Sequence, residues 1–228
     1  MDFAQLSQAR YSLRKFSDRP VEPEKLSAVL EAGRNAPTAH NLQPQRIFVL
    51  QTPEALEKAD ACTAAHFHPP VMLVVAYDPE AAWKRETDGK NHGEIDAAIA
   101  VTQMMLQAAD LGLGTTYVGM FEPEKLLAAF PEMEGLVPIA LLPMGYGAEG
   151  AHPSRLHADR KPMEELVRYL QKKKDCPLGS LFLSVRCLIF CGPGIPGGCG
   201  SSRCGRSGNA GGRTPASTKA APRPPPAG

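Results

Sequence analysis

The chain has 228 residues, of which 43% are hydrophobic, and its formal net charge at pH 7 is +1. This length allows one large domain or two small ones with a buried core. A net charge near zero gives no electrostatic footprint for nucleic acid or an anionic membrane, and no apolar run is long enough to span a bilayer. Residues 1–5 are polar and unlike a signal peptide, so a cytoplasmic location is expected.

Composition divides the chain into two parts. Before residue 175 there is one cysteine, Cys62, so no disulfide framework is expected there. We predict a folded domain over 1–174 and a disordered tail over 175–228, because the tail is rich in glycine and proline. A zinc site is the weaker alternative for the tail, since its cysteines are irregularly spaced and lack a histidine; the candidate ligands are Cys187, Cys191, Cys199 and Cys204.

Spacings of apolar residues typical of helices and of strands alternate along residues 1–174. The apolar spacing predicts helices over 2–9, 23–35, 53–64, 94–111, 123–130 and 162–174. Apolar runs predict strands over 46–50, 71–77, 115–120 and 139–144. Prolines punctuate a loop over 37–44, and the polar stretch 83–92 is also expected to be a loop. This pattern indicates an α+β layer design.

The predicted helix over 94–111 carries apolar residues around its circumference. Such a helix must be enclosed on nearly all sides. In a chain of this size, a partner subunit could supply part of the enclosure.

Arg10, Ser12 and Arg14 alternate along one short segment. Side chains two apart point the same way on an extended backbone. Two guanidinium groups and a hydroxyl on one side suit a phosphate, because arginine offers paired, charge-assisted donors. Alternating basic residues also occur on plain solvated faces, so the segment alone does not decide between the two. Residues 1–174 contain no Gly-x-Gly-x-x-Gly or Walker motif, which argues against a Rossmann or P-loop site.

Several segments, in order, resemble the FMN-dependent nitroreductase family over about residues 1–172. They are the segment 10–16, the loop 36–44, the stretch 96–100 with its continuation 112–119, and the segments 144–146 and 160–162. The resemblance implies a mixed, mostly antiparallel central sheet of four to five strands flanked by helices. It also implies an intertwined homodimer with FMN at the subunit interface.

The resemblance assigns residues to the flavin. Arg10, Tyr11, Ser12, Arg14 and Arg160 would form the phosphate end of the cofactor site. From the other subunit, Pro37, Thr38, Ala39 and Asn41 would touch the ring and ribityl chain, and Gln43 would approach a polar atom of either. Val118 and Gly119 would lie along the ring edge, with the Gly119 N–H directed at flavin N5. Glycine suits that place because a backbone donor without a side chain can come close to a flat ring.

The implied function is an oxidoreductase that moves hydride from NADH or NADPH through FMN to nitroaromatic, quinone or similar acceptors by a ping-pong mechanism. The flavin carries the chemistry, so neither a catalytic side chain nor a metal is expected. Another flavin enzyme on this scaffold, such as a dehalogenase or dehydrogenase, and a non-enzymatic flavin carrier are the alternatives.

Two features near the implied site have two readings each. His40 could touch substrate at the rim of the site or be an ordinary surface histidine. The loop 83–92, which begins at Trp83, could be a lid over the site or a solvated loop packed on the partner.

Overall fold

The structure, a computed structural model, describes residues 2–170. The chain divides into two compact units, Met1–Pro162 and Met163–Gly228. In the second unit, the described residues include one short helix, α6 (Met163–Leu166). The predicted tail, its cysteines and the boundary at residue 175 lie outside the described residues.

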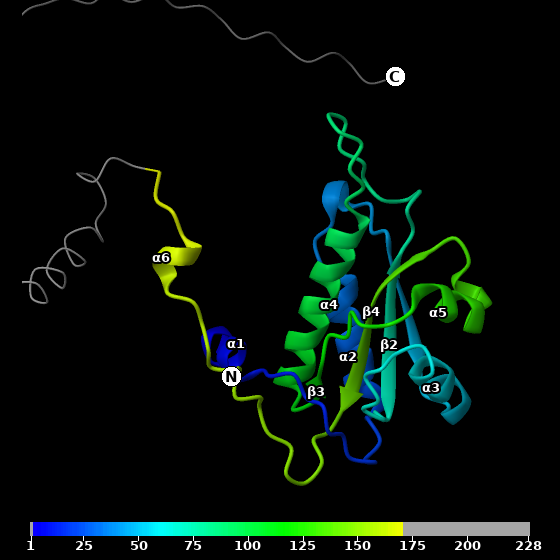
Figure 1. The fold of residues 1–228 in the computed structure, drawn as a ribbon, viewed down its shortest axis with the longest axis vertical. Coiled ribbons are helices and arrows are strands. Elements are labelled where there is room, and N and C mark those ends of the chain that lie inside the picture. Colours follow the sequence, from blue (N-terminus) through cyan, green and yellow to red (C-terminus); the bar gives the residue numbers. More distant parts are fainter. Residues whose placement is uncertain (1, 171–228) are drawn as a thin grey trace, which may run out of the picture. The chain divides into compact units, whose positions relative to one another are not determined.

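A four-stranded sheet forms the centre of the first unit (Figure 1). Its strands are β1 (Gln45–Leu50), β2 (Val71–Tyr77), β3 (Gly114–Thr115) and β4 (Val137–Gly145), in the order β1-β2-β4-β3. All three strand pairs are antiparallel. A parallel bridge between Ser12 and Thr115 adds the N-terminal segment beside β3. The predicted α+β fold with a mostly antiparallel sheet is confirmed.

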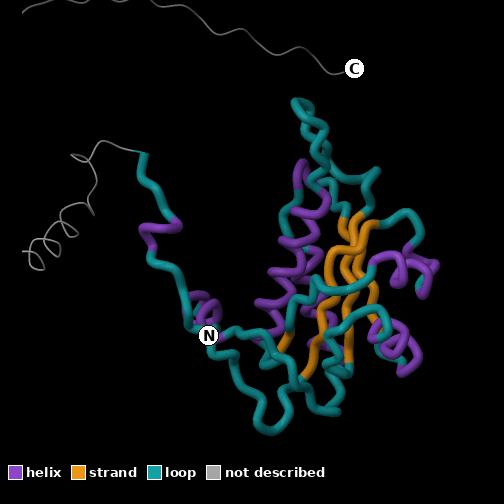
Figure 2. Tube along the Cα trace, viewed as in Figure 1, coloured by secondary structure: helices purple, strands orange, loops and turns teal. Residues whose placement is uncertain are grey.

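Helices cover both faces of this sheet and give three layers (Figures 1 and 2). On one face lie α2 (Pro23–Arg34) and α4 (Gly93–Asp110). On the other face lie α3 (Pro53–Asp60), α5 (Pro123–Ala129) and the short 3₁₀ helix η2 (Pro131–Met133). A seven-residue helix, α1 (Phe3–Ala9), packs beside α4 and contains no buried residue.

Alternation along the central strands creates two cores. In β2, Val71, Leu73 and Val75 point toward α2 and α4. Met72 and Val74 point toward α3 and α5. All five are buried, which is why β2 reads as one continuous apolar run.

Within one chain, the helix α4 is fully covered only on the side that faces the sheet and α2. Its buried residues include Ala97, Val101 and Met104, and α2 approaches closely at Gly33, where an added Cβ would lie 2.9 Å from the Met104 side chain. On the opposite side, Ile95 is 42% exposed and Leu106 is half-buried. One chain therefore leaves part of this apolar helix in contact with solvent.

No helix within residues 2–170 has the length and apolar composition needed to cross a bilayer.

Three predicted elements are shorter in the structure than the sequence suggested. The strand predicted over 115–120 pairs regularly only at β3, because Thr116 lies opposite Pro143, which has no N–H to continue the ladder. The helix predicted over 53–64 ends at Asp60, since the chain turns there and Thr63 bridges to Phe121. Of the helix predicted over 162–174, the described residues show the single turn of α6.

Candidate functional site

The N-terminal segment runs extended along the end of the sheet. The Leu13 N–H donates to the Thr115 carbonyl at 3.0 Å, and the Ser17 N–H donates to the Tyr146 carbonyl at 2.9 Å. Leu13 is buried, so its neighbours Ser12 and Arg14 face the opposite side. We call residues 10–17 the strap.

The strap forms one wall of a cavity of about 260 Å³, which we call the arginine cavity. Residues from the strap and from the segment after β4 share its lining: Arg10, Tyr11, Ser12, Arg14, Ser154, Leu156, His157 and Arg160. The predicted phosphate residues are thus brought together although Arg160 is far away in sequence. Three arginines therefore line one cavity, and no aspartate or glutamate is among its lining residues.

The hydrogen bonds of these arginines leave room for an anion. Arg14 Nη1 donates to the Ser12 carbonyl at 3.3 Å, and Arg160 Nη1 donates to the carbonyls of His157 and Asp159 at 2.6 and 2.7 Å. Arg10 Nη1 is buried and has no partner among the described residues. A buried, charged donor without an acceptor is costly. An anionic oxygen in the cavity would satisfy it, so the donor set fits a phosphate.

His157 lines the same cavity and was missed by sequence reasoning. Its Nε2 lies 3.0 Å from the Gln8 carbonyl, so this nitrogen carries a proton and donates. Its ring also meets the Tyr11 ring edge-on, with centroids 6.2 Å apart. The available signal was weak: a histidine three residues before Arg160 in a polar segment.

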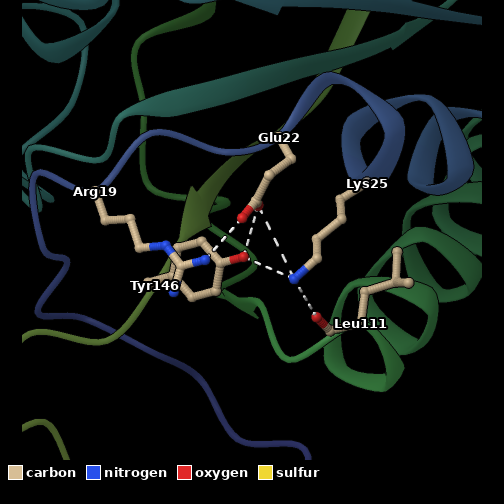
Figure 3. Close-up of polar contacts among 5 residues, drawn as sticks. All are labelled: Arg19, Glu22, Lys25, Leu111 and Tyr146. Atoms are coloured by element: carbon tan, nitrogen blue, oxygen red, sulfur yellow. Dashed lines mark hydrogen bonds and ion pairs between the residues drawn. The ribbon is translucent and has the colours of Figure 1, made fainter.

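A salt-bridged cluster joins the start of α2, the end of α4 and Tyr146, which follows β4 (Figure 3). The Tyr146 hydroxyl donates to Glu22 Oε2 at 2.6 Å and accepts from Lys25 Nζ at 2.7 Å. Lys25 also donates to the Leu111 carbonyl at the end of α4, and the Arg19 guanidinium lies 3.8 Å from the centre of the Tyr146 ring. The Tyr146 hydroxyl, a backbone hydrogen bond and the charges of Arg19 and Lys25 lower the pKa of Glu22 to about 2. The cluster ties the start of α2 and the end of α4 to Tyr146, whose carbonyl accepts the Ser17 N–H of the strap.

The 37–43 loop lies at the other end of α4. It contains the 3₁₀ turn η1 (Ala39–Asn41), and His40, Asn41 and Gln43 all have positive φ, between 52° and 54°. Non-glycine residues rarely adopt this region, and they keep it only where surrounding contacts impose it. The imposing contacts are the Ala39 N–H donating to Asp96 Oδ1 at 3.0 Å and the Gln43 N–H donating to Thr38 Oγ1 at 3.1 Å.

Asp96 anchors this loop from the first turn of α4. Its side chain is 3% exposed, and its Oδ2 has no partner among the described residues. Pro37, His40 and Asn41 project from the anchored loop and are exposed. The sequence did not identify Asp96 as a residue of the site, although it belongs to the stretch that carried the family resemblance.

Val118 and Gly119 lie at the edge of the sheet. Val118 is buried and exchanges two 2.9 Å backbone hydrogen bonds with Leu141 of β4. Gly119 is exposed, and the nearest atom to an added Cβ would be 3.8 Å away, in the Tyr117 ring. Within the described part of the chain, no group accepts a hydrogen bond from the Gly119 N–H, so this donor is open to a ligand.

The loop and the arginine cavity are far apart in one chain. Asp96 lies in the first turn of α4, whereas the cavity lies beside Thr115, beyond its last turn. The 18 residues of α4 span about 27 Å at 1.5 Å per residue. The structure therefore brings the phosphate candidates together but does not bring the 37–43 loop to them.

Two other kinds of chemistry find no support in the described residues. Burial raises the pKa of the Cys62 thiol, and its Sγ donates to the Lys58 carbonyl at 3.1 Å, so it is no activated nucleophile. Among residues 2–170, no three histidine, cysteine, aspartate or glutamate side chains gather as they would around a metal ion.

Known proteins resemble this chain in sequence and in structure. A model of the nitroreductase family matches residues 8–67 and 58–146. An NADH dehydrogenase of Thermus thermophilus is 30% identical over 190 residues, which cover 69% of this chain and 91% of that protein. An FMN reductase of Bacillus subtilis is 28% identical over 156 residues, covering 60% of this chain and 63% of that protein.

Two solved structures extend the likeness to the fold. A nitroreductase family protein of Clostridium difficile is 39% identical with a TM-score of 0.70, covering 75% of this chain and 100% of that one. A protein of Desulfovibrio desulfuricans, described as a nitroreductase in complex with FMN, is 27% identical with a TM-score of 0.60, covering 74% of this chain and 95% of that one.

Proposed function

The chain belongs to the nitroreductase family, and from this premise we propose that it is an FMN-dependent oxidoreductase. It takes hydride from NADH or NADPH and passes electrons to nitroaromatic, quinone or similar acceptors by a ping-pong mechanism. The observation that carries the proposal is a cavity lined by three arginines, one of which, Arg10, has a buried Nη1 without a partner among the described residues. That donor set suits the phosphate of FMN.

Each part of the site has its own task. Arg10, Ser12, Arg14 and Arg160 bind the phosphate, and His157 keeps the far wall of the cavity in place through its bond to Gln8. The Gly119 N–H, which has no acceptor among the described residues, would offer the ring a hydrogen-bond donor. When bound, FMN supplies the hydride chemistry. The protein positions the reactants, so no nucleophile or general base is required.

The site is assembled from two chains. FMN is shorter than the distance between the arginine cavity and the 37–43 loop of the same chain, which lie at opposite ends of α4. In a twofold dimer with α4 helices packed against each other, the loop of one chain reaches the cavity of the other. The half-exposed apolar side of α4, with Ile95 and Leu106, supplies the packing surface.

The names of the relatives support the donor and the cofactor. The Thermus protein is named an NADH dehydrogenase, the Bacillus protein an FMN reductase, and the Desulfovibrio structure contains FMN. We carry the nicotinamide donor and FMN over to this chain on that basis and on the fit of the arginine cavity.

Anaerobic titration tests the proposal. The purified protein is expected to bind FMN, and NADH or NADPH should bleach the flavin absorbance, which an added quinone should restore. A flavin-loaded protein that neither nucleotide reduces would favour the flavin carrier. A protein that binds no FMN would refute the proposal.

A further inference from the structure

The exposed histidine of the 37–43 loop lies flat on an aromatic side chain. The His40 ring stacks on the Trp83 ring with centroids 5.4 Å apart and planes inclined by 27°. The Trp83 ring in turn meets His92 edge-on at 4.7 Å. Trp83 is the only tryptophan in the chain. It comes from the stretch whose two readings, a lid or a solvated loop, the sequence left open.

The backbone fixes Trp83 in this position. The Trp83 carbonyl accepts the His92 N–H at 2.9 Å, Lys84 bridges to Asn91, and the Arg85 N–H donates to the Lys90 carbonyl at 2.9 Å. These bonds make a hairpin that projects beyond the start of α4 (Figure 1). His92 is the N-cap residue of α4, so the hairpin that carries Trp83 is joined directly to the helix that anchors the loop through Asp96.

The His40 ring is held on one side and open on the other. Its backbone has a φ of 52°, a conformation imposed by the anchored loop, and Trp83 covers one face of the imidazole. The residue is exposed, so the other face is turned outward. A flat ring with a rigid aromatic backing is a surface on which another planar ring can stack.

We propose that Trp83 is a positioning residue, which holds the imidazole ring of His40 in a fixed orientation at the rim of the flavin site. Planar aromatic substrates stack on this ring and are therefore bound in preference to non-planar ones. The inference rests on the proposed function, because it places the loop of one chain at the flavin of its partner. It deepens that function by assigning to His40 and Trp83 the preference for planar quinones and nitroaromatics over compact, non-planar electron acceptors.

The stack itself can be measured without FMN. In the apoprotein, the emission of Trp83 should change in intensity when His40→Asn removes the stacked ring. Asparagine is the control for backbone effects, because it tolerates positive φ about as well as histidine. Unchanged emission would mean that the two rings do not stack, and it would overturn the inference.

Binding of menadione to the oxidised, FMN-loaded protein tests the selection. Stacked aromatic pairs contribute binding free energy. His40→Asn and Trp83→Leu should therefore each raise the menadione dissociation constant about 2- to 10-fold. Trp83→Phe should largely restore binding. The double variant should be no worse than either single variant, because both disrupt one stack. FMN affinity and the KM for ferricyanide, which is not planar, should not change. Phe67→Leu, on the opposite face of the sheet, is the matched control.

The other outcomes are distinguishable. Menadione binding that is unaffected by Trp83→Leu, with FMN bound normally, overturns this inference alone. Equal losses for FMN, ferricyanide and menadione would show that Trp83 only maintains the loop, and would also overturn it. A fall in kcat for His40→Asn without a change in menadione binding would instead make His40 a proton donor. Failure of the wild-type protein to bind FMN would overturn the proposed function and this inference together.

Discussion

Arg10→Met should weaken FMN binding and, at the same time, stabilise the protein without FMN. Arg10 Nη1 is buried and has no partner among the described residues. A buried donor left without an acceptor costs about 1–3 kcal/mol. Methionine removes the donor but keeps most of the aliphatic stem, so the variant regains part of this cost. The ligand loses a hydrogen bond to a charged group, worth about 1.5–3 kcal/mol, or about 10- to 150-fold in Kd.

Two measurements on the same preparation check these opposite effects. Flavin fluorescence titration gives the Kd for FMN, and thermal denaturation of the apoprotein gives the Tm. Arg155→Met is the control, because this substitution removes the same charge at an exposed residue that does not line the cavity. The reasoning is refuted if Arg10→Met binds FMN as tightly as the wild type. A loss of FMN affinity no greater than that of Arg155→Met would reduce the role of Arg10 to net charge.

Substitutions at three further positions give testable outcomes. Gly119→Ala should leave the fold intact, since the nearest protein atom to the new Cβ is 3.8 Å away. Gly119→Pro removes the N–H and should slow flavin reduction more than Gly119→Ala does in stopped-flow measurements. The pKa of Glu22 is lowered from 4.5 to about 2, so its stabilising contribution is complete above pH 4.5 and is lost as the pH falls through about 2. Glu22→Gln should therefore flatten the dependence of Tm on pH in this range. A variant whose Tm falls with decreasing pH as steeply as that of the wild type would contradict the account. Gly33→Ala places a Cβ 2.9 Å from Met104, so overpacking should cost about 1–3 kcal/mol of stability in denaturant titrations.

Local sequence patterns predicted the parts of the fold that depend on local periodicity. The continuous apolar run predicted β2 as a strand buried on both faces. The recurring apolar residues predicted α4 as a long helix with a buried side. The alternation of Arg10, Ser12 and Arg14 predicted that they share one side, and all three line the arginine cavity. The assignment of the 37–43 loop and of Gly119 to the flavin depended on family resemblance and stays a prediction.

Contacts between distant segments were not predictable from periodicity. The short β3 results from Pro143, which lies on a different strand and lacks the N–H that Thr116 would need. His157 reaches the arginine cavity only because the segment after β4 returns to the strap. The stacking of His40 on Trp83 joins residues on separate loops, and neither residue carries a local signal for it.

A mixed dimer tests the central claim that the site is built from two chains. One chain carries Arg10→Met in the arginine cavity, and the other carries Asn41→Asp in the 37–43 loop, where aspartate tolerates the positive φ as asparagine does. The two chains are co-expressed with different tags, and the bound FMN is counted after tandem purification. If each site combines the cavity of one chain with the loop of the other, one site is intact and the mixed dimer binds one FMN at wild-type affinity, although both parent homodimers bind weakly. If each site is formed within one chain, both sites are damaged, and a mixed dimer that binds no FMN tightly would contradict the account.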